Sequence, residues 1–554
     1  MQVLDETRTK TNEINSQDKM VNGSAWMTGG SILSRILGVL YIIPWMAWMG
    51  NKDVATAANA LYGIGYTPYA LFLNIATAGV PSAIAKQVSY YNALGEYQVS
   101  RDIYKKGLQI MAITGVVSAV VMYVIAPFIA SNSPVATVAD STQVIRSLSW
   151  ALLIIPCMSV TRGFIQGHHT MAPSAISQVI EQVGRVIFML MAVYIIRIVM
   201  NGEVVDAVSA STFGAFVGAL FSTLYLLFVI WRKKPEMDRN LAISKKNSTV
   251  STNAILKSII KTAIPFIIIG SGITLYQLID QFTFDPMIRA VTNMTTKQII
   301  DHYAIVAVNA NKLIMVVISI AGSMAITSVP VISELLAKNK LKDMRDQLSN
   351  NIQLFFFIMF PAVIGMVVVS KPLYTVFYGY SAFGTSILQW SSYMSLFLGL
   401  FVLFGSTLQA INQTKAALMS LFIGLVVKLI TQFPLLYLFQ THGMLLSNIL
   451  GFGVTIYLML LALNKIAPLA IKPLAKQLSL IVLVTLAMSL IVFVVQLSMY
   501  QLFDHKNRLG ALFNVGISAT IGGFFYLYMT LKIRLADRLL GNRIEGLRRK
   551  LKIK

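Results

Sequence analysis

Fourteen long apolar runs constrain this 554-residue sequence more than any other feature. About 20 apolar residues in a helix cross a hydrocarbon core of about 30 Å. In lipid, a helix satisfies its own backbone hydrogen bonds, so these runs predict an all-α integral membrane protein with 14 transmembrane helices. The predicted spans are 24–49, 56–82, 106–130, 146–166, 175–200, 208–231, 257–280, 302–329, 352–376, 385–411, 416–440, 443–463, 475–500 and 509–531.

The charge composition supports a membrane protein and predicts its orientation. Hydrophobic residues make up 56% of the chain and charged residues only 12%, which is too apolar for soluble domains. The net charge of +23 comes from 45 Lys and Arg against 22 Asp and Glu, and most of these cations precede span 1 or follow even-numbered spans. Because Lys and Arg stay on the inner side, we expect both termini in the cytoplasm. The basic excess then indicates contact with anionic membrane lipids and argues against a nucleic-acid partner.

Two weak internal matches indicate duplication of a six-span unit. IATAGVPSAIAK at the end of span 2 matches MAITSVPVISEL at the end of span 8 at an offset of 249 residues, and QGHHTMAPSAIS near span 4 matches QAINQTKAALMS near span 10 at an offset of 243. Copies with an even number of spans share one orientation and form a parallel repeat. The predicted organisation is a cytoplasmic N-terminus (1–23), an N-lobe of spans 1–6 (24–231), a basic cytoplasmic linker (232–256), a C-lobe of spans 7–12 (257–463), spans 13 and 14 (464–531), and a basic amphipathic C-terminal tail (532–554).

The sequence lacks the common motifs of catalysis and of ATP-driven transport. It contains no Gly-x4-Gly-Lys-Ser/Thr phosphate loop, no His-Glu-x2-His, and no Gly-x-Gly-x2-Gly at a strand–helix junction. Cys157 is the only cysteine, which excludes disulfides within the chain and cysteine-based metal sites. We therefore expect no enzyme activity, no cofactor and no metal, and the two lobes instead suggest an alternating-access transporter.

Two cations near mid-membrane are the first candidates for substrate binding. Arg35 lies in span 1, and Lys312 lies in span 8 beside Asn311. A charge at this depth is costly and normally faces a polar cavity, so one cation from each lobe could form a site for a phosphate-containing anion. The alternative is that each cation pairs with a buried acid or with a helix C-terminus for structural reasons.

Four further charged residues within spans are also candidates for a functional or structural role. Glu181 and Arg185 are one turn apart on span 5 and are expected to form a structural ion pair, with a role in lobe packing or gating as the alternative. Asp280 in span 7 could hold a coupling cation or cap the span. Lys428 in span 11 could extend the basic cavity lining.

Several motifs together resemble a known transporter family. The run RGFIQGHHTMAPSAISQVIEQVGRV, with NGSAWMTGGSILSRILGVLY in span 1 and NKLIMVVISIAGSMAITSVPVISE in span 8, is similar to the polysaccharide-transport branch of the multidrug/oligosaccharidyl-lipid/polysaccharide (MOP) exporter superfamily. Within that branch the chain most resembles the MurJ-like and YtgP-like flippases. The resemblance implies a MATE/MOP-type transporter fold, adds Arg162 and Gln166 to the candidate cavity residues, and implies that spans 13 and 14 form a groove for a lipid tail.

The resemblance also implies a substrate and a location. The expected function is to flip an undecaprenyl-pyrophosphate-linked peptidoglycan precursor (lipid II) across the bacterial plasma membrane, with coupling to Na⁺, to H⁺ or to the membrane potential left open. In such flippases Arg35 corresponds to a cavity arginine, and Lys312 falls where the family has an arginine. The alternatives are export of another lipid-linked glycan (teichuronic acid, capsule or exopolysaccharide), multidrug antiport, and a scaffold that recruits cell-wall synthesis proteins.

Overall fold

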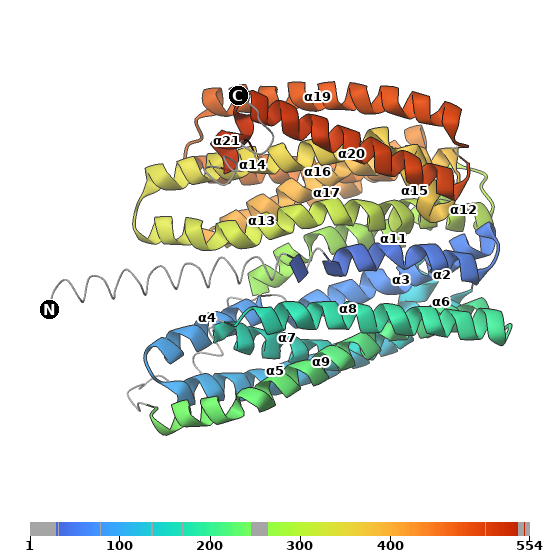
Figure 1. Cartoon of the computed structure of the whole chain (residues 1–554). Coiled ribbons are helices and arrows are strands. Elements are labelled where there is room, and N and C mark those ends of the chain that lie inside the picture. The colour runs from blue at the N-terminus through green and yellow to red at the C-terminus, as the bar shows by residue number, and fades with distance from the viewer. Residues whose placement is uncertain are drawn as a thin grey trace. The chain divides into compact units, whose positions relative to one another are not determined.

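The computed structural model describes residues 29–30, 33–77, 79–134, 137–168, 170–244, 264–504, 506–540 and 548 (Figure 1). The predicted N-terminal segment 1–23 and residues 245–256 of the predicted linker lie outside these residues, as do 541–547 and 549–554 of the predicted tail. The described residues form helices and no strand, which confirms the all-α prediction.

The chain divides between Leu278 and Ile279 into two compact units, called here the N-terminal and C-terminal units. The helices that precede this division are α2 (Ile42–Met49), α3 (Lys52–Thr77), α4 (Val80–Ala93), α5 (Tyr97–Ser131), α6 (Val138–Ser149), α7 (Ala151–Gly167), α8 (Ala172–Val193), the π-helical η1 (Tyr194–Val199) and α9 (Val204–Ala242). Helix α11 (Gly272–Val291) contains the division.

The C-terminal unit continues with α12 (Thr296–Tyr303), the π-helical η2 (Ala304–Ala310), α13 (Asn311–Ala337), α14 (Leu341–Val368), α15 (Ser370–Tyr378), α16 (Ala382–Ala410), α17 (Thr414–Phe439), α18 (Thr441–Ile466), α19 (Ile471–Leu502), α20 (Arg508–Lys532) and α21 (Leu535–Leu540). Each predicted span coincides with one or more helices of the described residues. Helix α9 continues to Ala242, so the first part of the predicted linker extends the helix of span 6.

Eleven helices among the described residues are long and apolar enough to cross a membrane, or twelve when the pair Ile264–Gly270 and Gly272–Val291, bent by 54°, counts as one span. The other two predicted spans coincide with the shorter apolar helix Leu33–Met49 and with α3. Helix α3 is less apolar because it packs on α2, α5, α6, α7 and α9 and faces protein more than lipid. The total of 14 spans stays a prediction.

The two units share one pattern of helix packing. In the N-terminal unit α8 packs on α9, α5 packs on α6 and α7, and α6 and α7 also pack on α3 and α9. In the C-terminal unit α17 packs on α18, α14 packs on α16, and α16 also packs on α13 and α18. These are the same pairs of spans in each copy, which is the arrangement that a duplicated six-span unit predicts.

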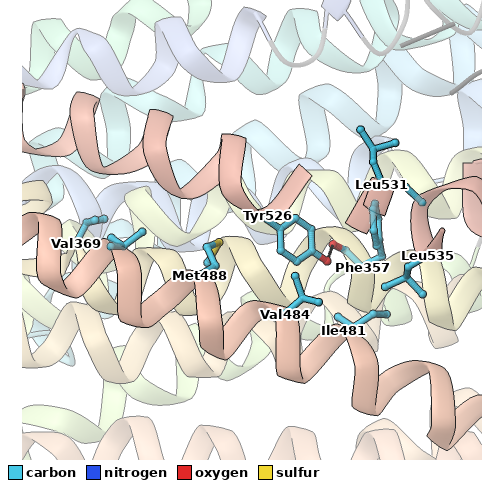
Figure 2. Packing of buried hydrophobic residues seen from close by; sticks show 10 residues of the cluster. Phe357, Val369, Ile481, Val484, Met488, Tyr526, Leu531 and Leu535 are labelled. Carbon is cyan, nitrogen blue, oxygen red and sulfur yellow. Dashed lines mark hydrogen bonds between the residues drawn. The ribbon is translucent and has the colours of Figure 1, made fainter. Parts of the chain in front are cut away.

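Spans 13 and 14, helices α19 and α20, attach to the C-terminal unit through one face (Figure 2). Pro361 in α14 has no N–H to donate to the Phe357 carbonyl one turn earlier, and the Tyr526 hydroxyl of α20 donates to that carbonyl at 2.8 Å instead. Val484 and Met488 of α19 pack in the same cluster. The same hydrophobic cluster contains Leu531 and the α21 residues Leu535 and Ala536. The start of the predicted tail therefore packs on protein.

Candidate substrate-binding and ion-pair sites

Arg162 joins three helices of the N-terminal unit. Its Nε donates to the Ser177 hydroxyl of α8 at 2.8 Å, and its Nη2 lies 2.8 Å from Glu181 Oε2 on the same helix. The same Nη2 donates to the Ser222 hydroxyl of α9 at 3.0 Å. The carboxylate neutralises this guanidinium, so Arg162 already has an anionic partner and holds α7, α8 and α9 together.

The predicted ion pair between Glu181 and Arg185 was wrong. Glu181 pairs with Arg162, whereas Arg185 Nη2 donates to the Tyr62 hydroxyl of α3 at 2.6 Å. The Arg185 guanidinium also lies 5.5 Å from the centroid of the Tyr66 ring. Residues one turn apart share a helix face, but both side chains are long enough to reach partners on different neighbouring helices.

Small residues fix the position of this part of α8. Gly214 and Gly218 of α9 lie against it, and a methyl group added at Gly218 would overlap the Glu181 carbonyl oxygen and approach Arg185 Cβ to 2.9 Å. Close approach at two small residues four apart is a common packing mode of membrane helices. It sets the backbone from which Glu181 and Arg185 reach their separate partners.

Gln166, at the end of α7, takes part in the connection to α8. Its Nε2 donates to the Ser174 hydroxyl at 2.7 Å across the short loop between the helices. The Phe164 carbonyl in the same helix end contacts His168 Nδ1 at 3.0 Å. A role of Gln166 in substrate binding stays a prediction.

Lys428 and Asp280 form a buried ion pair in the C-terminal unit. Lys428 Nζ of α17 lies 2.5 Å from Asp280 Oδ1 of α11, and the two side chains are 0% and 5% exposed. Asn448 Nδ2 of α18 donates to Asp280 Oδ2 at 2.7 Å. Gln432 Nε2, one turn after Lys428, lies 3.4 Å from Asp280 Oδ1 and 2.8 Å from the Thr283 hydroxyl.

Two predictions for this pair therefore need correction. Lys428 does not line an exposed cavity, because its ammonium group is buried against a carboxylate. Asp280 does not offer an open carboxylate to a coupling cation, because Lys428 and Asn448 contact its two oxygens. A buried charge with a partner of opposite sign and further hydrogen bonds is the arrangement expected away from water.

The two main candidate cations belong to different units. Arg35 is exposed, lies within electrostatic range of the Tyr66 hydroxyl, and makes no hydrogen bond or ion pair with another described residue. Lys312 and Asn311 are partly exposed and begin α13 directly after the π-helical turn η2. Such π-helical segments often occur at functional sites.

The neighbouring residue Asn309 has a separate structural role. Its Nδ2 donates to the Tyr374 hydroxyl at 2.9 Å, and its carbonyl accepts from the Tyr378 hydroxyl at 3.3 Å. These bonds anchor the π-helical turn to α15. Asn309 is buried, whereas Lys312 is partly exposed.

Comparison with known proteins gives the family. A family profile described as "Polysaccharide biosynthesis protein" matches residues 20–336, which is more than half of the chain. The chain belongs to this family. The lipid II flippase MurJ of Bacillus subtilis (strain 168) is 34% identical over 544 residues, covering 96% of this chain and 98% of the flippase. The stage V sporulation protein B of the same organism is 24% identical, covering 82% of this chain and 86% of that protein.

Solved structures show the fold that this family member adopts. A lipid II flippase MurJ in an inward closed conformation has a TM-score of 0.59 at 13% identity, covering 92% of this chain and 99% of that chain. An inward-facing multidrug resistance MATE transporter of the MOP superfamily has a TM-score of 0.58 at 15% identity, covering 80% of this chain and 96% of that chain. The predicted transporter fold and family resemblance are confirmed.

Sequence reasoning missed the polar partners of the charged residues. These partners are uncharged and therefore do not stand out among the residues of their spans: Tyr62 and Tyr66 on α3, and Asn448 and Gln432 in the C-terminal unit. Polar side chains inside apolar spans were the available signal, because such groups need hydrogen-bond partners in a membrane.

Proposed function

We propose that this protein is a lipid II flippase of the bacterial plasma membrane, with both termini in the cytoplasm. The main support is its 34% identity, over nearly the full length of both chains, to a protein named as a lipid II flippase. The excess of Lys and Arg before span 1 and after even-numbered spans supports the orientation. A multi-pass transporter fold agrees with this function.

In this proposal, Arg35 and Lys312 bind the diphosphate of the substrate during transport. The diphosphate and sugars of lipid II cannot cross hydrocarbon unaided, because burying an unpaired charge costs many kcal/mol. The planar guanidinium of Arg35 can donate two parallel hydrogen bonds to phosphate oxygens, and the ammonium of Lys312 acts as a compact charge. Alternating access of the two lobes then exposes the head group first inside and then outside.

The lipid tail remains in the bilayer, next to spans 13 and 14. Helices α19 and α20 each bury one face in the C-terminal unit and expose large apolar side chains elsewhere. Among these, Leu483 and Leu490 of α19 are 62% and 64% exposed, and Leu509 and Phe524 of α20 are 65% and 60% exposed. An apolar surface of this kind suits contact with a polyprenyl chain.

The membrane potential is the driving force in this proposal. An inside-negative potential of 100 mV favours outward movement of two negative charges by about 4–5 kcal/mol. Sodium has no evident site at Asp280, because Lys428 already neutralises that carboxylate. Replacing external and internal Na⁺ by N-methylglucamine should leave the initial flipping rate in liposomes unchanged within about twofold, whereas collapsing the potential should slow it. Loss of flipping on sodium removal alone would contradict this scheme.

Depletion in cells tests the physiological function. Cells in which this protein is the only flippase of its type should accumulate lipid II in the inner leaflet when it is depleted. Lipid II exposed at the outer surface should fall at the same time, as measured by a membrane-impermeant label. An expressed wild-type copy should restore the outer-leaflet signal. Unchanged distribution of lipid II after depletion would contradict the proposal.

A further inference from the structure

A second guanidinium of the N-terminal unit lies near the middle of a spanning segment. Arg185 is close to the centre of the span Ala172–Val199, and the one acid on that span, Glu181, is paired with Arg162. Among the described residues, no carboxylate lies within ion-pair distance of Arg185. A charge at this depth is costly unless it is compensated, so its retention without an acid needs an explanation.

The contacts of Arg185 hold the guanidinium in place but include no anionic partner. The Tyr62 hydroxyl accepts one of its five N–H donors at 2.6 Å, and the Tyr66 ring lies beneath the guanidinium at 5.5 Å. The rings of Tyr62 and Tyr66 stack at 5.8 Å with an interplanar angle of 13°. Because a tyrosine hydroxyl is neutral, these contacts orient Arg185 as a cation that still lacks an anion.

The internal repeat allows Arg185, which has no carboxylate partner among the described residues, to be compared with the equivalent cation of the other copy. At the offset of 243 residues found between spans 4 and 10, Arg185 aligns with Lys428. Both are cations on the fifth span of their copy. In the C-terminal unit Asp280 neutralises the cation, whereas in the N-terminal unit the position faces tyrosines. A purely structural cation would be expected to have the same kind of counter-ion in both copies.

The surface around Arg185 is accessible and already contains the first candidate cation. Tyr66 is 37% exposed, and Arg185 is partly exposed. Arg35 is exposed and lies within electrostatic range of the same Tyr66 hydroxyl. The helix that carries Arg35 also packs on α8, because Gly30 lies against Ala175 and Gly38 lies against Gln182. Neither Arg35 nor Arg185 has a carboxylate partner among the described residues.

We infer that Arg185, held by Tyr62 and Tyr66, is an anion-binding residue that binds the diphosphate of the lipid-linked substrate together with Arg35. This inference rests on the proposed function, and it gives the N-terminal unit two guanidinium groups for one diphosphate. Two such groups match a diphosphate better than a monophosphate, because each can bind a separate phosphoryl group through its fork. Arg185 therefore contributes to selecting diphosphate-linked lipids.

Binding measurements with matched lipids test this inference. We would titrate purified full-length protein in detergent with undecaprenyl diphosphate and with undecaprenyl monophosphate, following tryptophan fluorescence. Arg185→Gln should weaken binding of the diphosphate about tenfold and that of the monophosphate much less. Arg146→Gln is the control, because Arg146 also lies over a tyrosine ring, that of Tyr123 at 4.6 Å, in the same unit. Its affinity for both lipids should match that of the wild-type protein.

A conservative variant covers the case in which Arg185→Gln does not fold. Arg185→Lys keeps the charge but loses the planar guanidinium group that donates two parallel hydrogen bonds. This variant should retain binding while preferring the diphosphate less strongly than the wild-type protein does. If folded Arg185→Gln binds the diphosphate with wild-type affinity and prefers it over the monophosphate as the wild-type protein does, the inference is overturned and the proposed function stays intact. If the glutamine variant does not fold, the same result with Arg185→Lys overturns the inference. Absence of saturable diphosphate binding by the wild-type protein would overturn both.

Discussion

Lys428→Met alone should lower the free energy of unfolding by about 3–5 kcal/mol, because it leaves the Asp280 carboxylate buried without a counter-ion. Methionine has a similar length and no charge, so the change isolates the electrostatic contribution. The double variant Lys428→Met with Asp280→Asn should recover most of the loss, since neither buried charge then remains. Thermal unfolding of the purified protein in detergent, followed by circular dichroism, measures these differences.

The same helix provides a control for the Lys428 experiment. Lys415 lies near the start of α17 and is exposed, so Lys415→Met should change the unfolding temperature little. An unfolding temperature for Lys428→Met equal to that of Lys415→Met would contradict the ion pair. A double variant no more stable than Lys428→Met would show that the loss comes from packing and not from the unpaired carboxylate.

Arg35→Gln and Lys312→Gln should each reduce lipid II flipping by at least about tenfold, and the double variant should abolish it, because each removes a charge that binds the diphosphate. Arg35 is exposed and Lys312 is partly exposed, whereas Lys428 is buried against its acid. The initial flipping rate of a fluorescent lipid II in liposomes measures the effect.

Charge-retaining variants separate the roles of these two cations. Lys312→Arg should keep at least part of the lipid II flipping activity, because it preserves the charge and adds a planar guanidinium group that can donate two parallel hydrogen bonds. Arg35→Lys should lose more, because it replaces a fork with a point charge. Near wild-type flipping by the double glutamine variant, at equal protein level and unfolding temperature, would contradict the anion-binding role of both residues.

The fold was predictable because membrane helices follow from composition and length. Apolar runs place the helices, and weak matches at offsets of 249 and 243 residues indicate a duplication with which the helix packing agrees. Helix α3 shows the limit of this reasoning, because it packs among other helices and is less apolar than the eleven helices that are long and apolar enough to cross a membrane. High hydropathy indicates a helix that contacts lipid, and a helix surrounded by protein needs fewer apolar side chains.

The candidate site was predictable only as a set of charged residues. Their depth in the spans follows from the sequence, but partners separated by 19 to 168 positions, such as Glu181 for Arg162 and Asn448 for Asp280, depend on helix rotation and packing. The one-turn spacing of Glu181 and Arg185 favours a local pair, because spacing along one helix carries no information about partners on other helices. Lys428 was assigned to a cavity for the same reason, since its acid lies on another span.

Flipping by the purified protein in liposomes tests the central proposal most directly. The wild-type protein should move fluorescent lipid II between leaflets at a rate that rises with an inside-negative potential. It should move undecaprenyl-linked teichuronic acid or capsule precursors much more slowly under the same conditions. Faster transport of one of those glycans than of lipid II, or no transport of lipid II by folded protein, would contradict the assignment of this chain as a lipid II flippase.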